Sequence, residues 1–468
     1  MILAIDQSTS GTKAIVFSPD GEVLAKSFIE HKQIETKEGW IEHDPDEICK
    51  NVIAACESAA SGQTIDAIGI SNQRETSLCW SRKTGKPFYN AIVWQCGRAA
   101  PITERLSDHA DTVKKICGLP LSPYFCAAKF KWFLDNVPEA REAAKSNDLC
   151  LGTIDSWLVF KLSGSHKTDL SNASRTQLLS LDTLQWDPWL CELFGIPINA
   201  LPEICQSDDF FGNAEINKRS IPILACLGDS HAALYASSFF ESAAKATLGT
   251  GASVMANIGP ERAQNVTSGI AECLAWSISK QPAYALEGNI NYAGAIIKWL
   301  VEDIGLLGSS SQSGKIADSV ESSNGVYLVP AFSGLGAPHF NHNARAAFVG
   351  MNRTTKKAHL VRAAEEAIGY QIKDIVDEMA KSGLTLQSLS LDGGAAGDPF
   401  LAQFISDILG IEANASTLGE LSAAGVAALA ARTQFSFSRK RYTPEIDSQK
   451  RAALFEGWKI AIKMITNQ

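Results

Sequence analysis

Long apolar runs are the first thing that this 468-residue sequence lacks. No uninterrupted apolar stretch is long enough to cross a bilayer as a helix, which argues against an integral membrane protein. The opening residues, Met-Ile-Leu-Ala-Ile-Asp, form too short an apolar stretch and turn acidic too soon for a signal peptide. The sequence therefore predicts a cytoplasmic protein with no membrane partner.

A surplus of positive charge and paired cysteines are also missing. The 51 aspartates and glutamates outnumber the 42 lysines and arginines, so the net charge is −9, and no basic stripe offsets it. This balance argues against nucleic acid as a partner. The 11 cysteines are odd in number and include no Cys-x-x-Cys pair. That pattern favours neither a zinc site nor a disulfide framework and indicates a reducing compartment.

Chain length and an internal repeat indicate two domains. A chain of 468 residues exceeds what one hydrophobic core usually supports, so two domains of roughly 200 residues each are expected. Residues 2–17 read as a strand, a small polar turn and a second strand, and residues 246–255 repeat this arrangement. We place the domain boundary a few residues before Glu241, which gives an N-terminal domain over 1–238 and a C-terminal domain over 239–468.

The turn between the first two strands has the composition of a phosphate cradle. Its small polar residues, Thr9 and Ser10 among them, leave backbone N–H groups and hydroxyls free to point at an anion. Asp6 at the end of the first strand would hold a hydrated metal ion beside the phosphates. Lys13 would reach the terminal phosphate as a mobile charge. An ordinary hairpin with an exposed polar loop would account for the same residues.

Polar and aromatic residues follow two later strands. The buried-type strand 65–71 runs straight into a segment that holds Arg74 and Glu75. Adjacent opposite charges at the end of an apolar strand are poor core material and suit a ligand site, although a solvated surface ion pair is the alternative. The next strand ends in Trp94. Tyr124, which follows a proline, is a candidate wall residue for a pocket, and an exposed loop tyrosine is an equally common role.

Two further strands end in residues that suit catalysis or binding. The apolar run 221–227 ends in Gly-Asp229-Ser, where a carboxylate with small neighbours would accept a proton as a general base. A helix N-cap requires the same residue type. The strand 389–392 opens onto a glycine-rich turn before a helix, where bare backbone would hold a nucleotide. His339 and His342 have no third ligand near them, so no metal site is expected there.

Seven stretches, distributed along the chain, carry a resemblance to one family. They are Asp6-Gln7-Ser8-Thr9-Ser10-Gly11, Gly39-Trp40-Ile41-Glu42-His43-Asp44-Pro45, Asn72-Gln73-Arg74-Glu75-Thr76, Trp94-Gln95-Cys96, Gly228-Asp229, Gly249-Thr250-Gly251 and Asp392-Gly393-Gly394. These stretches resemble the motifs of the FGGY carbohydrate kinases, most closely those members that phosphorylate glycerol. The match runs from the first residue almost to the last and keeps the order of the motifs.

The resemblance implies a fold and a reaction. The fold would be the α/β, two-domain hexokinase–actin-like (ribonuclease H-like) fold, with the active site in the cleft between the domains. The cleft would hold ATP, Mg²⁺ and a small polyol or sugar, and the reaction would be phosphorylation of a primary hydroxyl. We also expect a homo-oligomer, in the form of a dimer.

The resemblance also assigns roles to single residues. Asp229 would be the base, Arg74 and Glu75 would hydrogen-bond the polyol, and Trp94 and Tyr124 would pack on its carbon skeleton. A metal ion would lie near Asp6 and Asp229, and Ser230 and Ser253 would border the polyol. The residues expected at ATP are Thr9, Ser10, Lys13, Gly249, Thr250, Gly294, Lys298, Gly394, Ala395 and Asp398.

Departures from the family pattern concern the choice of substrate. Ser230 stands where glycerol-phosphorylating members carry Gln, and Ser253 stands where they carry Phe, so the pocket would be wider and wetter. Such changes cost affinity for the original ligand on the order of 1 to 3 kcal/mol. The nucleotide side differs more mildly, with Lys13 in place of Arg, Lys298 in place of Gln and Asp398 in place of Asn.

Three hypotheses follow from these residues. The first is a kinase that acts on glycerol, favoured by the arginine, glutamate and tryptophan of the predicted polyol site. The second is a kinase of a larger polyol or ketose, such as erythritol or xylulose, motivated by Ser230 and Ser253. The third is a nucleotide-driven binding protein of the same fold without transfer chemistry, and loss of the polyol residues would be its mark.

Overall fold

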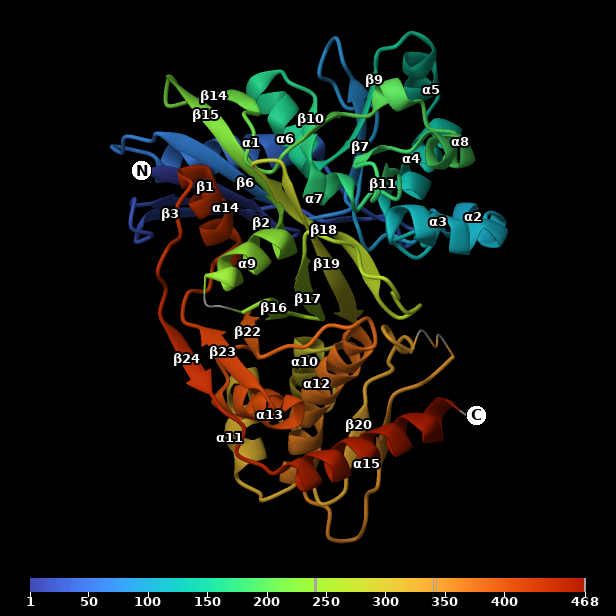
Figure 1. The fold of residues 1–468 in the computed structure, drawn as a ribbon, viewed down its shortest axis with the longest axis vertical. Helices are drawn as coiled ribbons and strands as arrows, with labels where there is room; N and C mark the ends of the chain where they lie inside the picture. The colour runs from blue at the N-terminus through green and yellow to red at the C-terminus, as the bar shows by residue number, and fades with distance from the viewer. Residues whose placement is uncertain (240–241, 340, 342, 467–468) are drawn as a thin grey trace.

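The computed structural model describes residues 1–239, 242–339, 341 and 343–466, and it contains two large sheets (Figure 1). The first sheet has the order β14-β15-β6-β1-β2-β3, and its three central strands β15, β6 and β1 are parallel. Its strands are β1 (Ile2–Gln7), β2 (Gly11–Phe17), β3 (Val23–Glu30), β6 (Ala67–Asn72), β14 (Gly212–Ile216) and β15 (Arg219–Gly228).

The second sheet comes from the C-terminal half of the chain. Its order is β18-β19-β17-β16-β22-β23-β24, with β16, β22 and β23 parallel. Its strands are β16 (Ala244–Leu248), β17 (Ala252–Gly259), β18 (Ala271–Ile278), β19 (Gln281–Ile290), β22 (Ser388–Asp392), β23 (Glu412–Ser416) and β24 (Arg439–Tyr442).

The two sheets repeat one topology. The order β3-β2-β1-β6-β15-β14 corresponds to β19-β17-β16-β22-β23-β24, and each neighbouring pair has the same relative direction in both sheets. The internal repeat inferred from residues 2–17 and 246–255 is therefore confirmed. The molecule has the two-domain hexokinase–actin-like α/β fold. The boundary at residues 238 and 239 stays a prediction, and Phe240 and Glu241 lie outside the described residues.

Two helices show how local sequence sets the elements. In α1 (Pro45–Ala59), the Asp44 carboxylate accepts a hydrogen bond from the Asp46 N–H at 2.9 Å, and proline occupies the first helical position. Apolar residues at three- and four-residue steps bury one face of this helix against β2 and β3. The same periodicity predicts a helix over 360–379, which is confirmed as α12 (Lys357–Ala380). The positions predicted on its apolar face are all buried, namely Val361, Ala364, Ile368, Ile372, Ile375 and Met379.

The remaining elements surround these sheets. A third sheet has the order β4 (Ile34–Glu35), β5 (Ile41–His43), β8 (Ala91–Ile92), β7 (Ser77–Ser81) and β9 (Leu149–Thr153). Three two-stranded pairs are β10 (Lys167–Asp169) with β13 (Glu203–Cys205), β11 (Leu179–Ser180) with β12 (Gln185–Trp186), and β20 (Tyr327–Val329) with β21 (Ala347–Val349).

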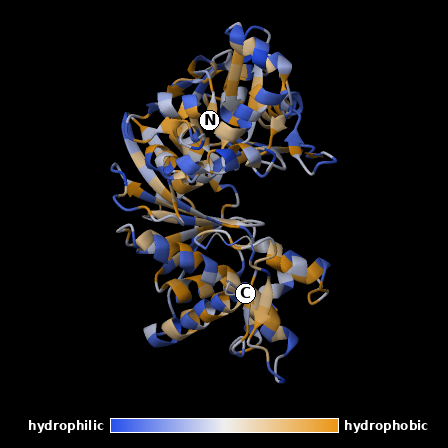
Figure 2. Cartoon of the chain, turned by 90° about the vertical axis from the view of Figure 1, so that its right-hand side faces the viewer, coloured by the Kyte–Doolittle hydropathy of each residue, from blue (hydrophilic) through white to orange (hydrophobic). Residues whose placement is uncertain are grey.

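The other helices surround or lie between the sheets of both lobes (Figure 1). In Figure 2 the outer helices carry both hydrophilic and hydrophobic residues, as expected of helices with one face on a core. Within the described part of the chain, no helix is both long and apolar enough to cross a membrane. These helices are α2 (Ala100–Arg105), α3 (Ala110–Cys117), α4 (Cys126–Asn136), α5 (Pro138–Lys145), α6 (Ile154–Ser163), α7 (Leu170–Ala173), α8 (Pro188–Phe194), α10 (Gly294–Glu302), α11 (Ser313–Asp318), α13 (Pro399–Leu409) and α15 (Ser448–Thr466).

Two helices pack on each other between the large sheets (Figure 1). Helix α9 (Asp229–Ser238) contacts β16 and β17 of the second sheet, whereas α14 (Leu421–Ala431) covers β1, β6 and β15 of the first sheet. The small residues of α14 allow this close approach. A Cβ added at Gly425 would lie 1.9 Å from the backbone oxygen of Ala232 in α9. A helix from the C-terminal half of the chain thus covers one face of the sheet that the N-terminal half forms.

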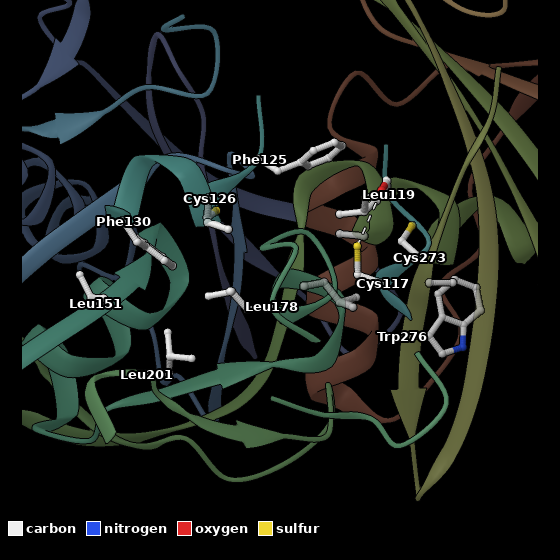
Figure 3. Close-up of a cluster of buried hydrophobic side chains, with 14 of the residues drawn as sticks. Cys117, Leu119, Phe125, Cys126, Phe130, Leu151, Leu178, Leu201, Cys273 and Trp276 are labelled. Carbon is white, nitrogen blue, oxygen red and sulfur yellow. Dashed lines mark hydrogen bonds between the residues drawn. The ribbon is translucent and has the colours of Figure 1, made fainter. Parts of the chain in front are cut away.

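A hydrophobic cluster also joins the two halves. Figure 3 shows side chains from α3 and α4, such as Cys117 and Phe130, in the same cluster as Cys273 and Trp276 of β18. All eleven cysteines of the chain are buried and free. Each half therefore buries apolar surface of the other.

Replacing Gly425 with alanine tests the close packing of α14 on α9. Glycine to alanine in a helix interior is normally favourable by about 1 kcal/mol. Here the added methyl meets a backbone oxygen, so we expect a loss of about 1–3 kcal/mol in the free energy of unfolding, measured by urea denaturation. Gly419→Ala is the control, because its Cβ would meet nothing within 4 Å. Equal stability of the two variants would contradict the packing.

Candidate active site

The carboxyl ends of three parallel strands meet at one edge of the first sheet. Gln7 of β1 pairs with Asn72 of β6, and Asn72 pairs with Gly228 of β15. The segments that follow these strands therefore emerge side by side. They are the turn 8–10, the segment with Arg74 and Glu75, and the start of α9 with Asp229. In parallel α/β sheets this edge is where ligands bind.

A chain of alternating charges links these segments to the second sheet. The Arg74 Nε lies 3.2 Å from Asp229 Oδ1, and Arg74 Nη2 donates to Glu287 Oε1 of β19 at 2.7 Å. The other Glu287 oxygen lies 2.6 Å from Arg175 Nη1, and Arg175 Nε donates to Glu75 Oε1 at 2.5 Å. Arg74, Glu75 and Asp229 therefore converge on one site, as the sequence predicts.

Burial makes this network electrostatically strong. Burial alone would raise the pKa of Glu287, but the guanidinium groups of Arg175 and Arg74 outweigh it and hold that pKa well below its usual range. The Asp229 side chain retains 37% of its exposure and is the member open to solvent. Its desolvation raises the pKa of Asp229, against the opposing charge of Arg74.

Asp229 is the first residue of α9, and the N-cap position belongs to Gly228. The alternative interpretation of Asp229 as an N-cap is therefore wrong. A side chain at Gly228 would collide with Arg74, because an added Cβ would lie 2.8 Å from the arginine Cδ. This glycine allows the carboxylate and the guanidinium to meet.

A second carboxylate, Asp6, lies close to Asp229. It is 8% exposed and accepts a hydrogen bond from the Ser71 hydroxyl at 3.1 Å. Burial raises the pKa of Asp6 to about 6, the Lys13 charge opposes that shift, and the Asp229 charge adds to it. The Lys13 ammonium itself donates to Glu420 at 2.7 Å, just before α14.

Aromatic residues form a wall beside the polar turn. The rings of Trp94 and Tyr124 meet edge to face with centroids 5.7 Å apart. The indole N–H of Trp94 donates to the Thr9 hydroxyl at 2.9 Å, which ties this wall to the turn, while Ser10 is exposed. The structure thus places both predicted wall residues beside the proposed phosphate turn.

The two serines that depart from the family pattern both contact the charged network. The Ser253 hydroxyl donates to Glu287 Oε1 at 3.0 Å, the same oxygen that accepts from Arg74. The Ser230 N–H donates to Asp229 Oδ1 at 2.6 Å. Ser253 therefore adds a polar group beside the carboxylate that holds Arg74.

A separate cavity of about 590 Å³ lies in the C-terminal half, a volume suited to a nucleotide. Its walls are glycine-rich loops tied to each other: the Gly294 N–H donates to the Gly249 oxygen at 2.9 Å, and the Ala395 N–H donates to the Leu248 oxygen at 3.2 Å. Seven residues predicted at ATP line it, namely Gly249, Thr250, Gly294, Lys298, Gly394, Ala395 and Asp398. Thr9, Ser10 and Lys13 do not line this cavity.

The structure adds residues to this cavity that the sequence did not reveal. Ser310, Ser311, Ser313 and Glu365 also line it. Burial raises the pKa of Glu365 to about 7. Asp398, the residue in place of Asn, caps α13 by accepting from the Phe400 N–H at 2.9 Å.

Two members of the charged network, Arg175 and Glu287, were not predicted from the sequence. Arg175 has no recognisable motif around it. Glu287 had a usable signal, because it is the only charged residue in the strand Gln281–Ile290.

His339, one of the two histidines at which no metal site was expected, lies 3.1 Å from the Asp374 carboxylate, and His342 lies outside the described residues.

Replacing Glu287 with glutamine tests the network. The variant keeps the side-chain shape but leaves Arg74 and Arg175 without their shared counter-charge, so we expect the free energy of unfolding at pH 7 to fall by about 3–5 kcal/mol. Urea denaturation measures it. Glu302→Gln is the matched control, because Glu302 is 58% exposed and lies 3.7 Å from Lys298. That surface pair contributes about 0–1 kcal/mol.

The same variant makes a prediction about pH. Because the pKa of folded Glu287 is below its unfolded value of about 4.3, the stability it provides is fully present above that pH and is lost as the pH falls further. The stability gap between the wild type and Glu287→Gln should therefore narrow below about pH 4. A gap that stays constant down to the acid limit of folding would contradict the assignment.

Comparison with known proteins places this site in a family. Models of the N-terminal and C-terminal domains of the FGGY family of carbohydrate kinases match residues 1–236 and 244–433. Glycerol kinase 1 of Thermotoga maritima is 43% identical over 100% of both chains. Glycerol kinase of Halothermothrix orenii is 42% identical over 98% of this chain and 97% of that protein.

A solved structure agrees over the whole chain. The crystal structure of Plasmodium falciparum glycerol kinase with ADP matches with a TM-score of 0.93 at 33% identity, covering 100% of this chain and 98% of that chain. The chain therefore belongs to the FGGY family of carbohydrate kinases and is an ATP-dependent phosphotransferase.

Proposed function

We propose that this enzyme transfers the terminal phosphoryl group of ATP to a primary hydroxyl of glycerol. The observation that carries the proposal is the contact between Asp229 and Arg74, at 3.2 Å, at the edge where the predicted polyol residues converge. Relatives that are about 40% identical over their full length are named glycerol kinases, which supports glycerol as the acceptor.

Asp229 acts as the general base. Its carboxylate is partly exposed and accepts the proton of the acceptor hydroxyl as the oxygen attacks phosphorus. Arg74 is 6% exposed, and its Nη1 has no hydrogen-bond partner among the described residues, so this nitrogen is free to donate to a polyol hydroxyl. Glu75 accepts from a second hydroxyl, and Trp94 and Tyr124 cover the carbon skeleton. Positioning supplies most of the rate in phosphoryl transfer.

The nucleotide binds in the glycine-rich cavity, with its phosphates directed toward Thr250 and the turn that holds Thr9 and Ser10. Asp6 and Asp229 fit a Mg²⁺ ion, because they are neighbouring carboxylates and Mg²⁺ prefers oxygen ligands. When bound, Mg²⁺ would neutralise charge on the phosphate oxygens. Lys13, held by Glu420, adds positive charge near Asp6.

A larger polyol or a ketose is the second candidate acceptor. The observation that favours it is the contact of Ser253 with Glu287, because a small hydroxyl side chain occupies the position where the family pattern implies a large apolar ring. An acceptor with four or five carbons would use the additional space.

The free, buried cysteines support the proposed cytoplasmic location. The homodimer stays a prediction.

Asp229→Asn tests the general base. The amide cannot take the proton, so we expect kcat to fall by about 10²- to 10⁴-fold, measured in a coupled assay for ADP. Affinity for ATP should change far less than kcat, because other residues line the glycine-rich cavity and Asp6 remains to hold the metal ion. Asp111→Asn, an exposed change on α3, is the control. Substantial turnover by Asp229→Asn would show that another group is the base.

To identify the acceptor, kcat/KM for glycerol, erythritol and xylulose is measured with the wild type and with Ser253→Phe. If a larger acceptor is native, the added ring should lower its kcat/KM by about tenfold or more while glycerol is affected less. Ser253→Ala, which removes the hydroxyl without filling space, is the control. If glycerol is native, the wild type prefers it on this panel. ATP hydrolysis that no acceptor stimulates would favour the binding-protein hypothesis.

A further inference from the structure

A fully buried lysine lies behind the predicted polyol residues. Lys129 of α4 has 0% exposure, and its ammonium donates to three backbone oxygens. These are the carbonyls of Glu75 at 3.0 Å, Trp94 at 3.3 Å and Tyr124 at 2.5 Å. The three residues come from three separate segments of the chain, and all three belong to the proposed polyol site.

A charged side chain is unusual at a position as fully buried as that of Lys129. Among the described residues, no carboxylate forms an ion pair with its ammonium, so its direct partners are the three carbonyl oxygens. The Tyr124 ring lies 5.9 Å from the ammonium, and the charge of Glu75 acts on it from a longer distance. Burial lowers the pKa of Lys129 to about 8. An apolar side chain of the same length would fill this space without the cost of desolvating a charge. The lysine offers what no apolar residue has, namely three N–H donors for three converging acceptors.

One of the three acceptors belongs to a strained residue. Glu75 has φ of 57°, a left-handed conformation that residues other than glycine rarely adopt. Its carbonyl also accepts from the Ser77 hydroxyl at 3.1 Å and the Cys126 thiol at 3.6 Å. This conformation directs the Glu75 carboxylate toward Arg175, at 2.5 Å. Donors on the carbonyl therefore stabilise the conformation that completes the charged network.

The helix that carries Lys129 is itself held firmly. Cys126 and Phe130, on either side of the lysine in sequence, extend into the hydrophobic cluster (Figure 3). The anchor point of the ammonium is thus fixed by core packing, whereas the three carbonyls that it binds lie in connecting segments. Loops positioned by a rigid element are a common way to build a binding site.

We propose that Lys129 is the positioning residue of the acceptor site, which holds Glu75, Trp94 and Tyr124 at the spacing that the polyol requires. It acts through their backbones and does not touch the substrate. The inference rests on the proposed function, because it assumes that these three residues bind the acceptor.

Lys129→Met tests the proposal, since methionine fills similar space without donors. We expect KM for glycerol to rise at least tenfold, while KM for ATP stays within twofold of the wild type. A merely structural role would reduce the fraction of active enzyme, and so the apparent kcat, without moving KM for glycerol. Lys131→Met is the matched control, because Lys131 lies on the same helix, is 34% exposed and pairs with Asp135 on the surface.

Lys129→Arg is the second variant and is used if Lys129→Met does not yield folded protein. Arginine keeps a charge and N–H donors at this position. The planar guanidinium cannot match three carbonyls arranged for an ammonium, so we expect KM for glycerol to rise about fivefold. If a folded Lys129 variant has the KM for glycerol of the wild type, this inference is wrong, while the proposed function still stands. A wild type that phosphorylates no polyol overturns the proposed function and this inference with it.

Discussion

A single carboxylate, Glu287, provides the counter-charge on which the arrangement of the site depends. It extends from β19 in the C-terminal half and binds Arg74 and Arg175, both from the N-terminal half. Each of the three side chains is almost fully buried, so neither arginine has water to stabilise its charge. The orientation of Arg74 toward Asp229, and of Arg175 toward Glu75, follows from this shared partner. The same contact joins the two halves of the molecule where the chemistry is proposed to occur.

The repeated topology carries different chemistry in each half. Asp6 of β1 pairs in register with Ser71 of β6, and the corresponding pair in the second sheet is Thr247 of β16 with Asp392 of β22. A hydroxyl and a carboxylate thus face each other in both sheets, on exchanged strands. Burial raises the pKa of Asp392, against the charge of the buried Lys245. In the first half a second carboxylate, Asp229, acts on this pair, whereas the charge that acts on Asp392 among the described residues is that of Lys245.

The sequence was informative where local chemistry decides the structure. The Asp44-Pro45 start of α1, the periodicity of α12 and the strand-turn-strand repeat all follow from near neighbours along the chain. The glycine-rich segments that line the cavity of the C-terminal half were predicted for the same reason, because turns require particular residues. Arg74 and Asp229 were predicted because Arg74 lies two residues after a strand and Asp229 directly follows one.

Residues whose partners are distant in sequence were not predicted. Lys13 was predicted to reach the terminal phosphate as a mobile charge, and nothing near it in sequence indicates the contact of its ammonium with Glu420, which is 407 positions away. Arg175 and Lys129 act on groups 100 and 54 residues distant, respectively. No local pattern encodes such contacts, because they depend on which strands and helices the fold brings together.

The position of α14 has a consequence for how the protein is made. Synthesis produces all six strands of the first sheet before the helix that covers β1, β6 and β15 has left the ribosome. During that interval the nascent N-terminal half exposes an apolar sheet face, a surface that invites aggregation and chaperone capture. Synthesis of α14, rather than of the first half alone, is therefore the event that closes this core.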